Sequence, residues 1–329
     1  MHRTTRPSRR LALAALGALA AAAARPARAQ ARFPERPIQW LVPFAPGGIA
    51  DLTARAVAEA MTPRLGQTVV VDNRPSAGSI VASQAVAGAR PDGHTLLLMS
   101  NGHAVSVGLF RKLPYDPLKD FAPVSLLGSF DLGLFVPAGS RFASLQDVLA
   151  FARAQPGRLT LGTIAVGSTQ HLAAKLFETT AGIDALVVPY KGSPAVLTAL
   201  RSGEIDLAVE IVGPMLPQVQ AGAVRVLAVS SDRRHPVLPD VPTVQQAGVA
   251  GYQVASWNAL AAPAGTPPEV IAALNRAVRE ALATSSVQDR LGRLGMRLGA
   301  STPAEMEALL AGEIRRWGEV IRRARIEPE

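Results

Sequence analysis

The chain has 329 residues, of which 34 are lysine or arginine and 25 are aspartate or glutamate, and its formal net charge is +9. It contains no cysteine, which excludes disulfides, thiolate nucleophiles and cysteine-ligated metal sites. Six arginines and no acidic residue precede Gln30, so the rest of the chain carries only +3. That modest charge gives no support for nucleic-acid binding.

The first residues have the pattern of an export signal. Four arginines between positions 3 and 10 precede an uncharged apolar run of fourteen residues, 11–24, and Ala27-Arg28-Ala29 has the small-x-small form of a cleavage site. A membrane-spanning helix needs about 20 apolar residues, so this run is too short to be one. We expect residues 1–29 to be a cleaved signal peptide and the mature protein to be periplasmic. The segment 8–13 resembles a twin-arginine motif, and the Sec route is the alternative.

The first strand expected in the mature chain, 38–42, runs into a turn that suits an anion. The turn Pro43-Phe44-Ala45-Pro46-Gly47-Gly48 leads into a helical pattern from Ile49 to Ala60. The first N–H groups of a helix have no intrahelical partner, and the helix dipole makes this end partially positive. Asp51, in the first turn, either caps these N–H groups or contacts a ligand. Because the turn contains no catalytic side chain, it indicates binding of a small anion without chemistry.

Strand and helix patterns then alternate along the chain. This alternation predicts an α/β fold with largely parallel sheets, in which ligands bind beyond the carboxyl ends of the strands. A final helix, 303–324, has an apolar face at spacings of three and four and carries most of its arginines elsewhere, as a solvated surface helix does. Strands are expected at 69–71, 95–99, 133–136, 159–162, 186–188, 206–209, 224–229 and 257–262.

Several motifs occur in one order between about residues 36 and 325. They are the turn 43–48, Asp72-Asn73-Arg74-Pro75, Pro91-Asp92-Gly93-His94-Thr95-Leu96-Leu97, Tyr190-Lys191-Gly192, Pro239-Asp240-Val241-Pro242-Thr243, Trp257-Asn258 and Ala262-Pro263-Ala264-Gly265-Thr266-Pro267. Together they resemble the tripartite tricarboxylate transporter substrate-binding proteins, also called Bug proteins. The resemblance implies a two-domain periplasmic-binding-protein fold (Venus-flytrap, type II-like) with a two-strand hinge. Domain 1 would comprise 31–128 plus 256–329, and domain 2 would comprise 129–255.

The resemblance also implies a function and a site. A small organic anion (a di- or tricarboxylate, an amino acid or an aromatic acid) would be held between the domains of a monomer and delivered to membrane permease subunits, with no cofactor. Its contacts in domain 1 would be Ala45, Pro46, Gly47, Gly48, Asp51, Ser76, Ala77, Gly78, Ser79 and Asn101. Those in domain 2 would be Thr163, Gly167, Ser168, Gln170, Tyr190, Lys191, Gly192 and Glu210.

Three of these positions depart from the family pattern. Ser76 and Ser79 stand where the family usually has glycine, and they add two hydroxyl donors. Glu210 replaces the expected aspartate or asparagine, so the choice of ligand can differ there. It would either bind an amine on the ligand or face solvent.

The sequence leaves two other functions open, an exported hydrolase-like enzyme on the same scaffold and a ligand sensor for a membrane receptor. Lys191 is a candidate for a Schiff base, and Ser168 with His171 has the i,i+3 spacing of a nucleophile and base. Neither has an orienting acid or a G-x-S-x-G elbow beside it, so Ser168 is better interpreted as a helix N-cap or ligand donor. The histidines lack metal-ligand spacing. We therefore expect no catalytic residue and no metal.

Overall fold

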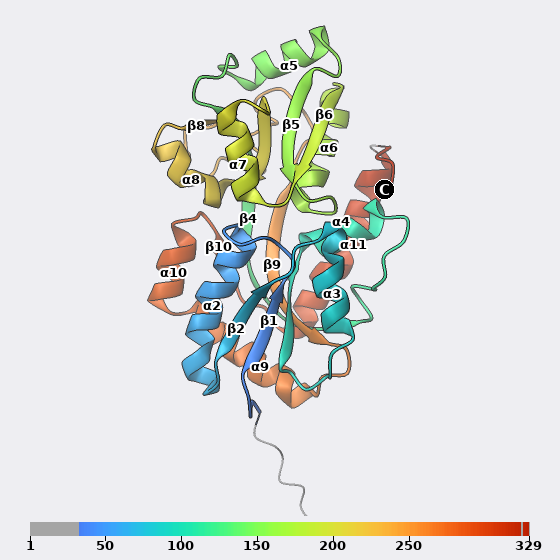
Figure 1. Ribbon diagram of the computed structural model, residues 1–329, viewed down its shortest axis with the longest axis vertical. Coiled ribbons are helices and arrows are strands. Elements are labelled where there is room, and N and C mark those ends of the chain that lie inside the picture. The colour runs from blue at the N-terminus through green and yellow to red at the C-terminus, as the bar shows by residue number, and fades with distance from the viewer. Residues whose placement is uncertain (1–32, 324, 329) are drawn as a thin grey trace, which may run out of the picture.

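The computed structural model describes residues 33–323 and 325–328, so the predicted signal peptide, residues 1–29, lies outside the described residues. The described chain forms two lobes stacked along the long axis of the molecule (Figure 1). Each lobe is built on its own sheet, and one strand of 17 residues, β4 (Phe121–Pro137), belongs to both sheets.

The first lobe contains a sheet with the strand order β2-β1-β3-β9-β4, and β10 pairs with β4. Strand β1 pairs in parallel with β2 and β3, whereas β9 runs antiparallel to both β3 and β4. Its other strands are β1 (Ile38–Val42), β2 (Val69–Asn73), β3 (Thr95–Ser100), β9 (Ala255–Pro263) and β10 (Arg297–Leu298). Its helices are α2 (Ile49–Leu65), η1 (Ala77–Ser79), α3 (Ile80–Ala87), α4 (Asn101–Leu109), α9 (Pro268–Leu282), α10 (Ser285–Gly292) and α11 (Pro303–Arg323).

The second lobe repeats this plan with fewer elements. Strand β5 pairs in parallel with β6 and β7. Strand β4 pairs antiparallel with both β7 and β8. The strands are β5 (Leu159–Ile164), β6 (Ala185–Tyr190), β7 (Leu207–Ile211) and β8 (Val224–Val229). The helices are α5 (Leu145–Ala154), α6 (Thr169–Ala181), α7 (Ser193–Ser202) and α8 (Val212–Gln220).

The predicted α/β class is confirmed, but the expectation of largely parallel sheets is wrong, because β9 runs antiparallel to β3 and β4 and β4 pairs antiparallel with β7, β8 and β10. The last helix buries Met306, Leu310, Trp317 and Ile321, as its apolar spacing predicts, and packs against α4. The arginines of its outer side are exposed, in keeping with a solvated face. None of the helices in the described part of the chain is long and apolar enough to cross a lipid bilayer.

Two segments of the described backbone cross between the lobes, and Ser230 forms hydrogen bonds with both. In β4, Asp131 still pairs with Ala255 of the first sheet, while the next residue, Leu132, pairs with Ile211 of the second. The other crossing is made by Val254, which precedes β9. The hydroxyl of Ser230 donates to the carbonyl oxygen of Val254 at 2.6 Å and accepts from the N–H of Leu132 at 3.2 Å. The backbone N–H of Ser230 donates to the Leu132 carbonyl at 2.9 Å, and its carbonyl accepts from the Val254 N–H at 2.9 Å.

Replacing this serine should weaken the joint between the lobes. Ser230 is 0% exposed, so Ser230→Ala leaves the Leu132 N–H without this acceptor in a site that water does not reach. We expect the free energy of unfolding, measured by urea denaturation, to fall by about 1–3 kcal/mol. Ser286→Ala, at an exposed position of α10, is the matched control and should change it by less than about 0.5 kcal/mol. Equal stabilities for the two variants would contradict the role of Ser230.

Candidate functional site

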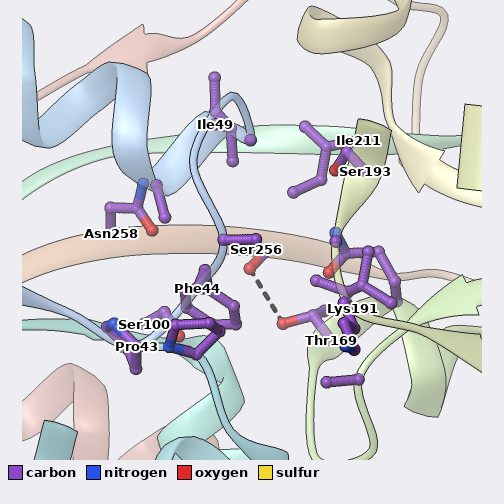
Figure 2. A pocket seen from close by; sticks show the side chains of 18 of the residues that line it. Pro43, Phe44, Ile49, Ser100, Thr169, Lys191, Ser193, Ile211, Ser256 and Asn258 are labelled. Carbon is purple, nitrogen blue, oxygen red and sulfur yellow. Dashed lines mark hydrogen bonds between the residues drawn. The ribbon is translucent and has the colours of Figure 1, made fainter. Parts of the chain in front are cut away.

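A cavity lies between the two lobes, and we call it the interlobe cavity. The empty space among its lining residues, open solvent included, is about 550 Å³. Figure 2 shows side chains from both lobes around it, with Ile49 and Asn258 on one side and Ser193 and Ile211 on the other. The lining residues are Pro43, Phe44, Ala45, Gly48, Ile49, Ala50, Pro75, Ser76, Ser100, Phe130, Ile164, Ala165, Thr169, Gln170, Lys191, Gly192, Ser193, Ile211, Ser256 and Asn258.

The starts of five helices reach this cavity. The first lobe contributes the first turn of α2 and the N-cap of α4; the second contributes the first turns of α6 and α7 and the N-cap of α8. The N-cap residues of α2 and α7 are Gly48 and Gly192, and neither helix start receives a side-chain capping hydrogen bond. Because the first N–H groups of a helix lack intrahelical partners and carry the positive end of the dipole, these starts favour an anion. Lys191, exposed at the cavity edge, adds a full positive charge.

The walls between these helix starts combine apolar side chains with hydroxyl and amide groups. The apolar surface comes from Phe44, Ile49, Phe130, Ile164 and Ile211, and the polar groups come from Ser76, Ser100, Thr169, Gln170, Ser193, Ser256 and Asn258. The hydroxyls of Thr169 and Ser256 form a hydrogen bond of 3.0 Å, the dashed line in Figure 2. No aspartate or glutamate is present among the described residues that line the cavity. The site therefore suits a compact anion with an apolar body.

The turn before α2 is held by Asp51. Its Oδ2 accepts a hydrogen bond from the Gly47 N–H at 3.0 Å, and its Oδ1 pairs with Arg55 Nε at 2.9 Å. Asp51 is only 4% exposed and does not line the cavity. Gly47 has a φ of +85°, in the region that favours glycine. Asp51 therefore has neither of the two roles considered from sequence: it holds the turn before α2, does not cap the start of the helix and does not line the cavity. Pro46 and Gly47 shape the turn from outside the cavity, while Ala45 and Gly48 line it.

The second predicted loop of the first lobe reaches the cavity only through Ser76. The Ser76 hydroxyl accepts from the Val81 N–H at 3.0 Å, so it also caps the helical segment that follows. Ala77, Gly78 and Ser79 lie outside the lining. Gly78 instead connects the lobes, because its N–H donates to the Val166 carbonyl at 2.9 Å. Ser79 has a φ of +59°, an unusual value for a residue other than glycine.

A further group of predicted residues lies behind the cavity wall. Asn101 accepts from Trp317 Nε1 at 2.9 Å and donates to Thr169 Oγ1 at 3.3 Å, which links α11 of the first lobe to α6 of the second. Gly167 accepts from the Ser106 hydroxyl at 3.1 Å, a second connection between the lobes. Ser168 accepts from the His171 N–H at 3.0 Å as the N-cap of α6.

Thr163 donates to the neighbouring Ile164 carbonyl at 3.3 Å. Like Asn101, Gly167 and Ser168, it is buried and does not line the cavity. The structure therefore brings these four residues to the wall of the site without exposing them to the cavity. His171, whose spacing from Ser168 suggested a base, is buried, and burial lowers its pKa to about 4, with Lys175 contributing in the same direction.

The remaining predicted residues divide between the cavity and its surroundings. Gln170, Lys191 and Gly192 line it. Tyr190 does not line the cavity, and its hydroxyl donates to Glu204 Oε1 at 2.7 Å. Partial burial and this carboxylate raise the pKa of Tyr190 to about 12.

The sequence suggested that Glu210 either binds an amine on the ligand or faces solvent. The structure shows neither, since Glu210 is 0% exposed and does not line the cavity. Its Oε2 accepts from the Ile211 N–H at 2.9 Å and from Gln170 Nε2 at 3.4 Å. Burial raises the pKa of Glu210 to about 7, while the hydrogen bonds from Ile211 and Gln170 and the neighbouring Ser193 hydroxyl act in the opposite direction. The carboxyl group thus stands directly behind residues that do line the cavity.

Many of the lining residues are not among those predicted from the sequence. Some had a local signal, because Thr169 and Ser193 adjoin predicted residues at helix starts, and Pro43 and Phe44 belong to the recognised turn. Ser256 and Asn258 had none for this site, since only the pairing of β9 with β3 and β4 brings them to the gap. The residues missed are Pro43, Phe44, Ile49, Ala50, Pro75, Ser100, Phe130, Ile164, Ala165, Thr169, Ser193, Ile211, Ser256 and Asn258. Within the described residues, no group of three or more acidic or histidine side chains is placed to hold a metal ion.

Comparison with known proteins decides the family. Residues 53–326 match the model of the tripartite tricarboxylate transporter family receptor. The chain belongs to this family. The periplasmic binding protein BugD is similar, with 30% identity, 90% of this chain and 100% of that chain covered and a TM-score of 0.87. The resemblance to Bug proteins and the expected two-lobed binding-protein fold are thereby confirmed.

Two solved structures of similar proteins contain ligands. MatC from Rhodopseudomonas palustris, solved with bound malate, is 35% identical; the match covers 88% of this chain and 100% of MatC, with a TM-score of 0.84. Rpa4515 from R. palustris, solved with adipate, is 36% identical, covering 90% of this chain and 100% of that one, with a TM-score of 0.86. Both ligands are dicarboxylates.

Proposed function

We propose that this receptor captures a small dicarboxylate in the interlobe cavity and presents it to the membrane permease subunits of a tripartite transporter. In this proposal, residues 1–29 direct export to the periplasm. The domains 31–128 plus 256–329 and 129–255 then close on the ligand, which leaves chemically unchanged.

The observation that carries the proposal is the convergence of helix starts from both lobes on one cavity. A carboxylate at the starts of α2 and α4 would receive backbone N–H groups from the first lobe, and one at the starts of α6 and α7 would receive them from the second. The apolar surface of Phe44, Phe130 and Ile211 lies in the same cavity and suits the carbon chain of a dicarboxylate. Each helix end contributes only about 0.3–1 kcal/mol when exposed, so several must act together.

A dicarboxylate fits this lining better than an amino acid does. An ammonium group needs a carboxylate or several acceptors, and no acidic side chain is present among the described lining residues. Lys191 and the helix starts would instead oppose a positive charge. The dicarboxylates bound by MatC and Rpa4515 support this choice.

A thermal-shift screen of residues 30–329 tests the proposal. The panel contains malate, adipate, citrate, aspartate, leucine and benzoate. Ligand at 100 times its dissociation constant adds about 2.7 kcal/mol of stability, which corresponds to a rise in Tm of several degrees for a protein of this size. We expect a dicarboxylate to give the largest rise and to be recovered with unchanged mass. No shift with any carboxylate would contradict the proposal.

Closure of the lobes is tested at Gly192, on the second lobe, which faces Ala45 on the first. A Cβ atom at Gly192 would lie 2.7 Å from the Cβ of Ala45, closer than two such atoms can approach. The φ of Gly192 is 172°, an extended conformation that alanine also adopts. Gly192→Ala should therefore fold normally but hold the lobes apart. We expect its affinity for the dicarboxylate found in the screen to fall at least tenfold, about 1.4 kcal/mol, by isothermal titration calorimetry.

Gly139→Ala is the matched control, because a Cβ at Gly139 has no atom within 4 Å. This variant should bind as the unaltered protein does. Wild-type affinity in Gly192→Ala would show that the ligand does not need the lobes to meet at this point.

A further inference from the structure

Glu210 is a buried carboxyl group whose two oxygen atoms differ. Oε2 receives hydrogen bonds from the Ile211 N–H and the Gln170 amide. Oε1 is buried and has no hydrogen-bond partner among the described residues. An ionised carboxylate needs donors on both oxygens when water is excluded, so this environment opposes the charged form. A proton on Oε1 would remove the charge while leaving both bonds to Oε2 in place.

The donors near Glu210 also belong to the cavity wall. Gln170, Ser193 and Ile211 all line the interlobe cavity, and polar groups of all three favour the ionised form of Glu210. Gln170 and Ile211 donate hydrogen bonds to its Oε2. Ser193 and Ile211 lie together at one side of the cavity in Figure 2. An ionised Glu210 therefore competes with a ligand carboxylate for the same amide and hydroxyl donors. A neutral Glu210 accepts hydrogen bonds more weakly and leaves these donors available to the ligand.

We propose that Glu210 makes ligand capture proton-linked: it is neutral when the cavity holds a carboxylate, and it thereby favours anion binding in mildly acidic surroundings. This proposal rests on the proposed function. In the protonation step, a proton leaves a buffer acid or hydronium ion and an O–H bond forms at Oε1. No other covalent bond changes. Two like charges across one wall would otherwise repel each other, so a bound anion raises the proton affinity of Glu210 further.

Other charged and titratable groups lie on the elements around Glu210. Asp131 of β4 is in a bidentate ion pair with Arg297, with distances of 2.8 and 3.0 Å. His171 of α6 has a pKa lowered to about 4 by burial, so it does not change charge near neutral pH. The remaining groups are Lys175 and Glu178 of α6, which pair with each other at 3.5 Å, Arg201 in the last turn of α7 and Lys191 just before that helix. Among these, Glu210 itself is the carboxyl group that lacks a partner on one oxygen.

The first experiment needs no ligand. The pKa of Glu210 is about 7 in the folded protein and near 4.5 when unperturbed, so the unfolded state holds fewer protons between these values. The contribution of Glu210 to the free energy of unfolding is therefore fully present below about pH 4.5, and it falls as the pH rises toward 7. We subtract the Tm of the unaltered protein from that of Glu210→Gln at each pH. We expect this difference to be at least about 3 °C larger at pH 7.5 than at pH 5. A constant difference would overturn the proposal.

The second experiment measures malate binding, or binding of the best dicarboxylate from the screen, between pH 6.5 and pH 8.5. Carboxyl groups ordinarily titrate near pH 4, so the ligand keeps its charge over this range. We expect the affinity of the unaltered protein to fall about fivefold or more with rising pH. Calorimetry at pH 7.5 in phosphate and in Tris should show uptake of a fraction of a proton per ligand bound.

Variants separate this effect from a purely structural role. Glu210→Gln is neutral at every pH and should bind with an affinity that changes less than twofold over the range, without proton uptake. Glu307→Gln, at an exposed position of α11, should keep the full pH dependence. Binding that is independent of pH in the unaltered protein, or equally pH-dependent in Glu210→Gln, would overturn the proposal while leaving the proposed function intact. Failure of every carboxylate to bind would instead contradict the proposed function, and the ligand-free experiment would still decide the protonation of Glu210.

Discussion

The structure depends on backbone N–H groups that two separate sheets direct into one gap. In each lobe, parallel strands end at the interlobe side, and helices begin directly after them, as α2 follows β1 and α7 follows β6. The carboxyl ends of parallel strands share one edge, so the helix starts gather there. The site thus attracts an anion mainly through the backbone, and side chains have the secondary task of shaping it.

Hydrogen bonds behind the cavity connect this site to the cores of both lobes. Trp317, buried in the last helix, donates to Asn101, which donates to Thr169 of the second lobe, and Thr169 shares a hydrogen bond with Ser256 at the start of β9. A buried polar group that loses its hydrogen-bond partner lowers the free energy of unfolding. This series of hydrogen bonds therefore favours one arrangement of the closed lobes. Glu210 differs from the groups in this series, because its Oε1 has no hydrogen-bond partner among the described residues.

Local signals in the sequence predicted much of the fold and part of the site. The glycine-rich turn before α2 and the strand–helix alternation are local patterns, and both correspond to observed elements. The strand expected at 133–136 is instead the end of β4, whose 17 residues serve two sheets, because pairing with β9 and then β7 extends it. Tyr190 lies at the expected place in the chain, but its hydroxyl points to Glu204, a contact that depends on how the end of β6 packs against the segment after α7. Ser256 reaches the cavity by long-range pairing, which no local pattern encodes.

A crystal structure with the dicarboxylate that stabilises the protein most would test the central claim directly. The account predicts that one carboxylate lies within hydrogen-bonding distance of the N–H groups at the start of α2 and the other at the starts of α6 or α7, with Ala45 and Gly192 in contact. A ligand bound outside the gap between the lobes, or held there chiefly by exposed cationic side chains, would contradict it.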